Sequence, residues 1–159
     1  MIAESKSAVS IRLATATDRA FLQQLAERLA DFDLPSSRTA DEIAEADRSA
    51  LNKALDHPIS GTELFVAEVN GQRAGCLLMW TLQDYFSGGW HSHISVIAVT
   101  REAEGKGVGR ALMDHAEAWA RERGHHTITL SVFENNRRAQ SLYERMGYKS
   151  EIRRYSKHL

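Results

Sequence analysis

Three glycines at alternate positions, Gly105, Gly107 and Gly109, separate an apolar, β-branched stretch from an amphipathic one. Glycine lets the backbone turn tightly and approach a ligand closely, with amide hydrogens pointing inward. A helix that begins here directs the positive end of its dipole, roughly half a charge, at the same point. Lys106 and Arg110 add positive side chains nearby. The segment therefore predicts an anion-binding turn suited to phosphate, and a tight turn that binds no ligand is the alternative interpretation.

The spacing of this turn excludes two common nucleotide-binding motifs. A P-loop follows the pattern GxxxxGK[ST], and no serine or threonine follows Lys106. A dinucleotide fingerprint needs a further glycine three residues after Gly109, where the chain has Leu112. Neither motif therefore accounts for the glycines.

A second informative segment follows downstream, where a short helix is predicted. Asn136 can cap this helix, and its apolar positions recur at i, i+3, i+4 and i+7. These apolar residues are Ala139, Leu142, Tyr143 and Met146. Gly147 is expected to end the helix, and Tyr148 begins the next segment.

Taken together, the two segments closely resemble the GNAT superfamily of N-acetyltransferases, and the resemblance extends over residues 9–156. The glycine turn resembles the family's acetyl-CoA signature V-x(n)-[RQ]-x-x-G-x-[GA], which ends here at residues 104–109. The second segment resembles the signature N-x-x-A-x-x-x-Y-x-x-x-G-[FY], at Asn136, Ala139, Tyr143, Gly147 and Tyr148. Two positions depart from the pattern, because Glu104 stands where Arg or Gln is usual and Arg101 where Pro is common. The Glu104 carboxylate is expected to lie beside the pyrophosphate and to weaken its binding by repulsion.

The resemblance implies acetyl-CoA as co-substrate and direct attack by an amine on its thioester within a ternary complex. It also implies that the strand ending at Val99 parts from the strand starting near Thr127. The main chain of Ile97 and Val99 is then expected to pair with the pantetheine arm, and the Val99 amide to polarise the thioester carbonyl. The cofactor-binding residues that the resemblance implies are Ile97, Val99, Glu104, Gly105, Lys106, Gly107, Val108, Gly109, Arg110, Asn136 and Tyr143.

The same resemblance assigns Tyr143 as the catalytic acid that protonates the departing thiolate. A phenol with a pKa of about 10 is a suitable donor to a thiolate. Ordinary core packing beside Leu142 and Met146 is the alternative role for this tyrosine.

The catalytic base is expected on the strand before the glycine turn. Side chains alternate along a strand, so His91, His93, Ser95, Ile97 and Val99 are expected to share one face. The family often has a Glu or His several residues before the cofactor-binding valine, and His93 matches that place and titrates in the useful range. A hydrogen-bonded structural histidine is the alternative. A metal site at His91 and His93 lacks a third ligand, so no metal is expected.

The acceptor is expected to enter beside the first two predicted helices and the loop around Tyr85 and Phe86. Residues 31–47 hold six acidic residues and one basic residue, Arg38. Such a segment could steer a cationic amine, such as a polyamine, an amino sugar or a lysine side chain, although a solvated helix face explains it as well. Four aromatic residues could line an acceptor pocket or pack across a hairpin: Trp80, Tyr85, Phe86 and Trp90.

The elements that must position these residues follow from periodicity. Strands are predicted at residues 9–13, 63–69, 72–82, 91–99, 127–133 and 148–155, and helices at 17–32, 39–55, 107–123 and 136–146. Asn70-Gly71 predicts a two-residue hairpin, while the strand–helix–strand step over residues 91–133 predicts parallel pairing. The order β-α-α-β-β-β-α-β-α-β, with a splayed mixed sheet, is the α/β GNAT fold implied by the resemblance.

Length and composition bound the remaining interpretations. The chain of 159 residues is expected to form a single domain, and its net charge of −1 gives no field for nucleic acid or anionic membrane. The lone cysteine, Cys76, is expected to be a buried and inert thiol. Residues 1–6 lack the pattern of an export signal, so a cytoplasmic location is expected. A homodimer is compatible with the family, and a non-catalytic sensor or partner subunit that binds acetyl-CoA or CoA is the alternative function.

Overall fold

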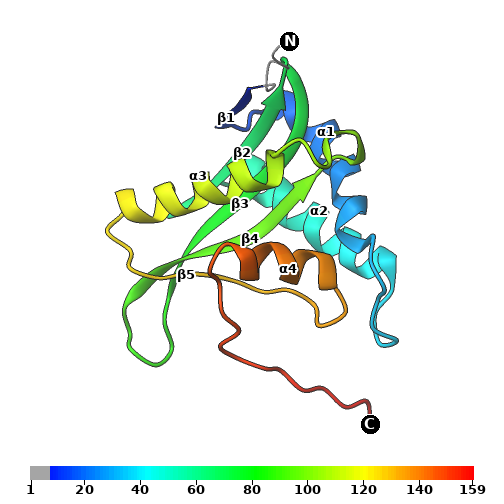
Figure 1. Cartoon of the computed structure of the whole chain (residues 1–159), viewed down its shortest axis with the longest axis vertical. Helices are drawn as coiled ribbons and strands as arrows, with labels where there is room; N and C mark the ends of the chain where they lie inside the picture. The colour runs from blue at the N-terminus through cyan, green and yellow to red at the C-terminus, as the bar shows by residue number, and fades with distance from the viewer. Residues whose placement is uncertain (1–7) are drawn as a thin grey trace, which may run out of the picture.

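The computed structural model describes residues 8–159, which are organised around a five-stranded sheet (Figure 1). Its strands are β1 (Val9–Leu13), β2 (Thr62–Val69), β3 (Gln72–Gln83), β4 (Trp90–Val99) and β5 (Ile128–Leu130). They lie side by side in chain order. The first three pairings are antiparallel and the pairing of β4 with β5 is parallel, which confirms the predicted mixed sheet.

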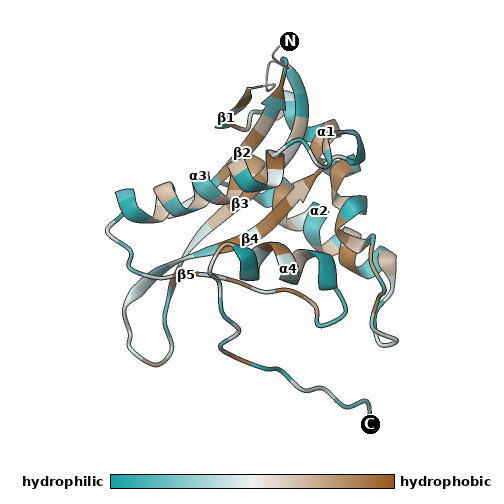
Figure 2. Cartoon of the chain, viewed as in Figure 1, coloured by the Kyte–Doolittle hydropathy of each residue, from teal (hydrophilic) through white to brown (hydrophobic). Residues whose placement is uncertain are grey.

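Helices cover both faces of the sheet. The helices α1 (Arg19–Leu25) and α2 (Ala40–Asp56) lie on one face, and α3 (Val108–Glu122) and α4 (Arg137–Arg145) lie on the other (Figure 1). Each face has its own buried cluster, and the strands between them are the most hydrophobic part of the ribbon (Figure 2). The buried stripe of α3 contains Val108, Leu112, Ala116 and Trp119, as its periodicity predicts.

The hairpin between β2 and β3 confirms the prediction from Asn70-Gly71. Both residues have positive φ, 52° for Asn70 and 75° for Gly71, as a type I′ turn requires. This turn matches the twist of the two strands and fixes their register. The register brings Cys76 opposite Val66 in the middle of the sheet. Cys76 is fully buried, as expected, and burial raises the pKa of its thiol to about 12.

Three predicted elements differ from the structure, two of them only in their extent or type and one entirely. The helix expected to reach Phe32 is α-helical only to Leu25 and continues as a 3₁₀ helix over Ala26–Ala30. The strand expected over 127–133 is confined to Ile128–Leu130. The strand expected over 148–155 is wrong, because those residues adopt no regular secondary structure. An alternating sequence forms a strand only where a neighbouring strand supplies hydrogen-bond partners, and the periodicity does not show whether one is present.

A bulge in β4 changes which face its side chains occupy. Leu78 pairs with Val96 but the next residue of β3, Met79, pairs with Ile94, so Ser95 is an extra residue in β4. Accordingly, Ile94 belongs to the cluster under α3, whereas Val96 belongs to the cluster under α1 and α2. The alternation of side chains is therefore broken in the middle of the strand.

The expectation that His91, His93, Ser95, Ile97 and Val99 share one face is consequently wrong. His93 pairs with Trp80, which packs on the α1 and α2 side, and the centroids of their rings are 6.2 Å apart. Ile97 and Val99, beyond the bulge, pack on the α3 side. His93 therefore lies on one face of β4, and Ile97 and Val99 lie on the other.

Within residues 8–159 no helix has the length and apolar character needed to cross a membrane. The expectation drawn from residues 1–6 lies outside the described part of the chain.

Candidate active site

The parallel pair of strands opens at the bulge. β5 pairs with β4 only from Ser92 to Ile94, so the last five residues of β4 have no strand on that side. Thr100 donates its amide hydrogen to the Ala74 carbonyl of β3 at 2.8 Å. Because bonding alternates along an antiparallel pair, the amide and carbonyl groups of Ile97 and Val99 point away from β3, toward the open edge. The predicted splay is therefore present, with main-chain groups free to pair with an extended ligand.

The glycine turn leads from this open edge into α3. Gly105 and Gly107 have positive φ of 74° and 80°, and a Cβ atom on either would meet no atom within 4 Å. Within residues 8–159, the amides at 105 and 107–110 have no hydrogen-bond acceptor, and no side chain caps α3. Unpaired amides around a helix start, facing open space, form a site for an anion such as a pyrophosphate.

Glu104 does not present an unpaired carboxylate to this turn. It forms ion pairs with Arg28, from the segment after α1, and with Arg138 of α4 at 3.0 Å. The Arg138 hydrogen bond is the largest cause that holds the pKa of Glu104 below its usual range. Asp31 extends the network by pairing with Arg28 and Arg101. The family usually has Arg or Gln at this position, whereas this chain has a carboxylate. The two arginines neutralise its charge, and the ion pairs link α4 to the glycine turn.

Of the other charged and polar residues predicted for the cofactor, Arg110 and Asn136 have local partners. Arg110 pairs with Asp114 one helical turn away, at 3.2 Å, and Lys106 lies on the exposed turn. The Asn136 side chain accepts a hydrogen bond from the Ala139 amide at 3.3 Å, so it caps α4 as predicted. The cap uses its oxygen and leaves its side-chain amide hydrogens available.

Tyr143 lies on α4, beside the turn and the open edge. It is partly buried against the cluster under α3, and burial raises the pKa of its hydroxyl. Within residues 8–159 the hydroxyl has no hydrogen-bond partner. α4 also contributes Leu142, and a Cβ atom built on Gly109 would lie 3.8 Å from both Leu142 and Val99. The tyrosine helix, the glycine turn and the open strand therefore meet at one place.

His93 lies on the face opposite Ile97 and Val99. Its Nδ1 atom is 2.8 Å from the Thr129 hydroxyl of β5, and within residues 8–159 this is the hydrogen bond its ring forms. Burial lowers the pKa of His93, and the nearby His91 lowers it further, so the ring is neutral over more of the neutral pH range. A neutral imidazole with one nitrogen held by a hydroxyl can accept a proton at the other.

The aromatic residues proposed for an acceptor pocket fall into two groups. Trp80 is partly buried against the α1 and α2 cluster, on the side of His93. Tyr85 and Phe86 of the β3–β4 loop and Trp90 at the start of β4 are 92%, 79% and 63% exposed, so their side chains lie largely in solvent. The acceptor-pocket role of these four residues stays a prediction, and Trp80 is the one that packs beside His93.

Sequence reasoning missed several residues of this region. Arg28 and Arg138 pair with Glu104 across separations of 76 and 34 residues, and no local pattern indicates such contacts. Thr129 was predicted to lie in a strand, but its hydrogen bond to His93 was not predicted.

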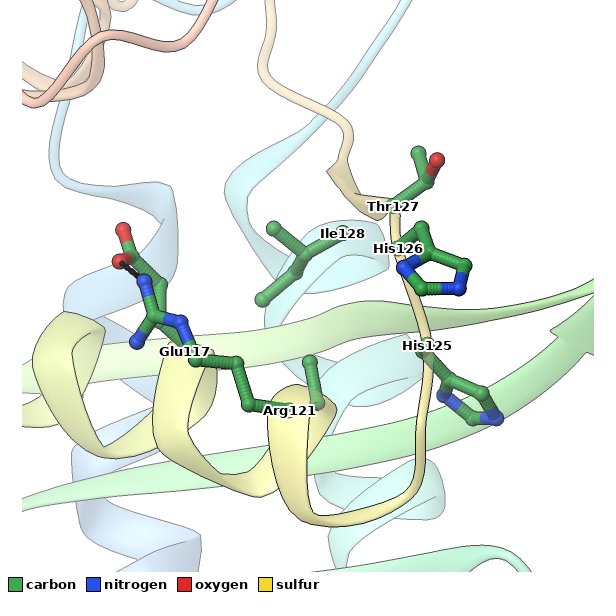
Figure 3. A pocket seen from close by; sticks show the side chains of 7 residues that line it. Glu117, Arg121, His125, His126, Thr127 and Ile128 are labelled. Carbon is green, nitrogen blue, oxygen red and sulfur yellow. Dashed lines mark hydrogen bonds and ion pairs between the residues drawn. The ribbon is translucent and has the colours of Figure 1, made fainter.

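A separate hollow lies at the other end of α3. Its volume is about 150 Å³, and its walls come from the last turns of α3 and the segment that leads into β5 (Figure 3). The lining residues are Glu117, Ala120, Arg121, His125, His126, Thr127 and Ile128. Ligand pockets usually have roughly 300–1,000 Å³, and the helix separates this hollow from the glycine turn, so it is distinct from the candidate site.

A mixed sheet that parts beside an amide-lined turn, with a tyrosine helix closing the gap, defines an acetyl-CoA-dependent acetyltransferase. The chain belongs to the acetyltransferase (GNAT) family, whose family model matches residues 19–148. This fold binds acetyl-CoA or CoA, and the amide turn and open strand described above fit such a ligand.

The chain is also similar to individual relatives and solved structures. The chain is 26% identical over 143 residues to the Bacillus subtilis (strain 168) protein named "Uncharacterized N-acetyltransferase YhfO", covering 90% of this chain and 91% of that one. A Bacillus halodurans C-125 structure described as a transcriptional regulator has a TM-score of 0.71 and 27% identity, covering 96% of this chain and all of that one. The aminoglycoside N-acetyltransferase AAC(6')-Iy in complex with CoA shares the fold, with a TM-score of 0.73, 17% identity and coverage of 100% and 99%.

Proposed function

We propose that the protein transfers the acetyl group of acetyl-CoA to a primary amine by direct attack in a ternary complex. The observation that supports this most is the row of unpaired amides at 105 and 107–110, which ends beside the open edge of β4. The pyrophosphate would bind these amides, and the pantetheine arm would pair with Ile97 and Val99 like an added strand. The thioester would then lie at the gap that α4 covers.

The reaction requires one new bond and two proton movements. The amine nitrogen attacks the thioester carbonyl carbon, the C–N bond forms and the C–S bond breaks. Tyr143 donates its phenolic proton to the departing thiolate and regains one from solvent. The proton lost by the nitrogen goes to His93, directly or through water. An amide hydrogen at the open edge, such as that of Val99, stabilises the oxyanion that develops on the carbonyl oxygen.

The role of His93 predicts a pH-dependent effect of its removal. The His93→Ala variant should lose about tenfold or more of kcat/KM near pH 7, since general-base catalysis is typically worth 10²–10⁴-fold and water can partly replace it. The loss should shrink above pH 9, where the amine is increasingly deprotonated without help. The measurement is a pH profile of acetyl transfer between pH 5.5 and 9.5.

The His93→Gln variant separates the base from a positioning role. Glutamine can keep a hydrogen bond to Thr129 but does not titrate in this range. It should therefore show the same loss as alanine. Restoration of activity and of the wild-type profile by glutamine would remove His93 from proton transfer.

An assay of thiol release tests the proposed function against the sensor alternative. The protein should bind acetyl-CoA by calorimetry and should release free CoA thiol when a panel of primary amines is added at pH 7–8.5. N-acetylated product should appear in equal amount by mass spectrometry. Tight binding of acetyl-CoA without turnover of any amine, whether small molecule or peptide, would instead favour the sensor.

A further inference from the structure

Glu104 stands directly before the glycine turn and binds two arginines from distant segments. Arg28 comes from the 3₁₀ helix after α1, and Arg138 comes from the first turn of α4. The side chains of Glu104 and Arg28 are 29% and 22% exposed, so their ion pair is largely shielded from solvent. Asp31 binds Arg28 in turn, which fixes that guanidinium from its other side. The Glu104 carboxylate is therefore held in place, and Arg138 binds to a fixed point.

The helix α4 has few other contacts that fix its position. None of its nine residues is fully buried. Within residues 8–159, the pair between Arg138 and Glu104 is the one hydrogen bond or ion pair that joins a side chain of α4 to the chain before residue 133. Gln140 bonds only to carbonyls of the adjoining segment, those of Phe133 and Glu134. A short helix that buries little surface gains little from packing, so this ion pair is a substantial part of what orients it.

Two contacts of α4 bracket the glycine turn. Arg138 binds Glu104 before the turn, at 3.0 Å. Leu142, one helical turn after Arg138, lies against the far end of the turn, where a Cβ atom on Gly109 would be 3.8 Å away. The unpaired amides lie between these two contacts. Tyr143 directly follows Leu142, so a helix that pivots about the Leu142 contact carries the Tyr143 hydroxyl with it.

We propose that Glu104 is a positioning residue, whose ion pair with Arg138 holds α4 in the orientation that directs the Tyr143 hydroxyl at the thioester sulfur. The inference rests on the acetyl transfer proposed above, with Tyr143 as the proton donor. Glu104 acts through the helix and takes no part in the bond changes. A misplacement of about 1 Å can cost a reaction about 10²-fold in rate, so a small pivot of α4 matters. Arg or Gln at position 104 would offer no carboxylate to Arg138.

Hydrogen exchange tests the position of α4 without any turnover. Glutamine at position 104 keeps the size of the side chain and removes its charge. In the ligand-free protein, the amides of α4 should exchange about fivefold faster in Glu104→Gln than in the wild type, as expected for the loss of one ion pair. The matched control is Glu68→Gln in β2, because Glu68 is 22% exposed and pairs with Arg12 at 2.9 Å. The control should leave exchange in α4 unchanged, and unchanged exchange in Glu104→Gln would overturn the proposal.

Steady-state kinetics separates positioning from cofactor binding. In Glu104→Gln, kcat should fall about five- to tenfold, while the KM for acetyl-CoA should change by less than about threefold. Arg138→Gln should show the same loss of kcat. Arg138→Lys keeps a cation that can reach the carboxylate, and it should recover most of the activity. A KM raised about tenfold or more at unchanged kcat would place Glu104 and Arg138 in cofactor binding and overturn the proposal.

A double-mutant cycle decides whether Glu104 acts through Tyr143. In the Tyr143→Phe protein, adding Glu104→Gln should lower kcat by less than about twofold, because no hydroxyl is left to misplace. A further loss as large as in the wild type would show that Glu104 acts independently, and it would overturn the proposal. If the wild-type protein acetylates no primary amine, the proposed function fails. Faster exchange of α4 in Glu104→Gln would then still support the role of Glu104 in holding the helix.

Discussion

Replacing Tyr143 by phenylalanine should lower kcat by roughly 10²–10⁴-fold, the range typical of general acid catalysis. The substitution removes only the hydroxyl, which has no hydrogen-bond partner within residues 8–159, so the packing of the ring against the α3 cluster is kept. The KM for acetyl-CoA should change by less than about threefold, because the hydroxyl acts on the leaving sulfur in the transition state. Steady-state kinetics of thiol release with a fixed amine measures both values.

The neighbouring Tyr148 supplies the matched control. Its ring centroid is 6.2 Å from that of Tyr143, and its hydroxyl donates to Glu117 at 3.5 Å. Burial and the Glu117 charge raise the pKa of Tyr148, so it is a poorer proton donor than its neighbour. Tyr148→Phe should therefore change kcat by less than about threefold. Equal losses in the two variants would show that Tyr143 contributes packing and not a proton.

A carboxylate at Gly107 should abolish most cofactor binding. Gly107 precedes α3 with a φ of 80°, and a side chain there would project into open space beside the unpaired amides. The Gly107→Asp variant should weaken acetyl-CoA binding by about 100-fold or more, because two like charges about 4 Å apart repel by several kcal/mol near a protein surface. Calorimetric titration with acetyl-CoA, at low and high salt, measures this loss.

The Gly107→Asn variant isolates the charge from the shape. Asparagine has the same size, tolerates the left-handed conformation about as well as aspartate, and carries no charge. It should retain at least about tenfold more affinity than the aspartate variant, and the difference should shrink at high salt. A negative charge at a helix start also stabilises the helix. The Gly107→Asp variant is therefore not expected to melt at a lower temperature than the Gly107→Asn variant. Equal affinities in the two variants would place the pyrophosphate elsewhere.

Much of the fold and part of the site could be predicted because their signals are local. The hairpin depends on two adjacent residues, Asn70 and Gly71, and the stripe of α3 on spacing within one helix. The glycine turn is likewise local, because the residues that adopt positive φ in it, Gly105 and Gly107, are themselves glycines. In each case the residues that determine the structure are close together in the chain.

The features that could not be predicted depend on distant parts of the chain. The bulge at Ser95 arises from the register with β3, and nothing in the alternating run of β4 marks the break. The network at Glu104 joins three segments that are separate in sequence. Residues after Leu130 alternate like a strand, but β4 has already turned away from them and no ladder forms.

Because β4 contains an extra residue, its two faces carry different functional residues. Ile97 and Val99 offer their side chains to one side, and His93 belongs to the other. Under the proposed mechanism, the acceptor amine would therefore approach the thioester from the face of β4 that carries His93, while the side chains of Ile97 and Val99 lie on the other face.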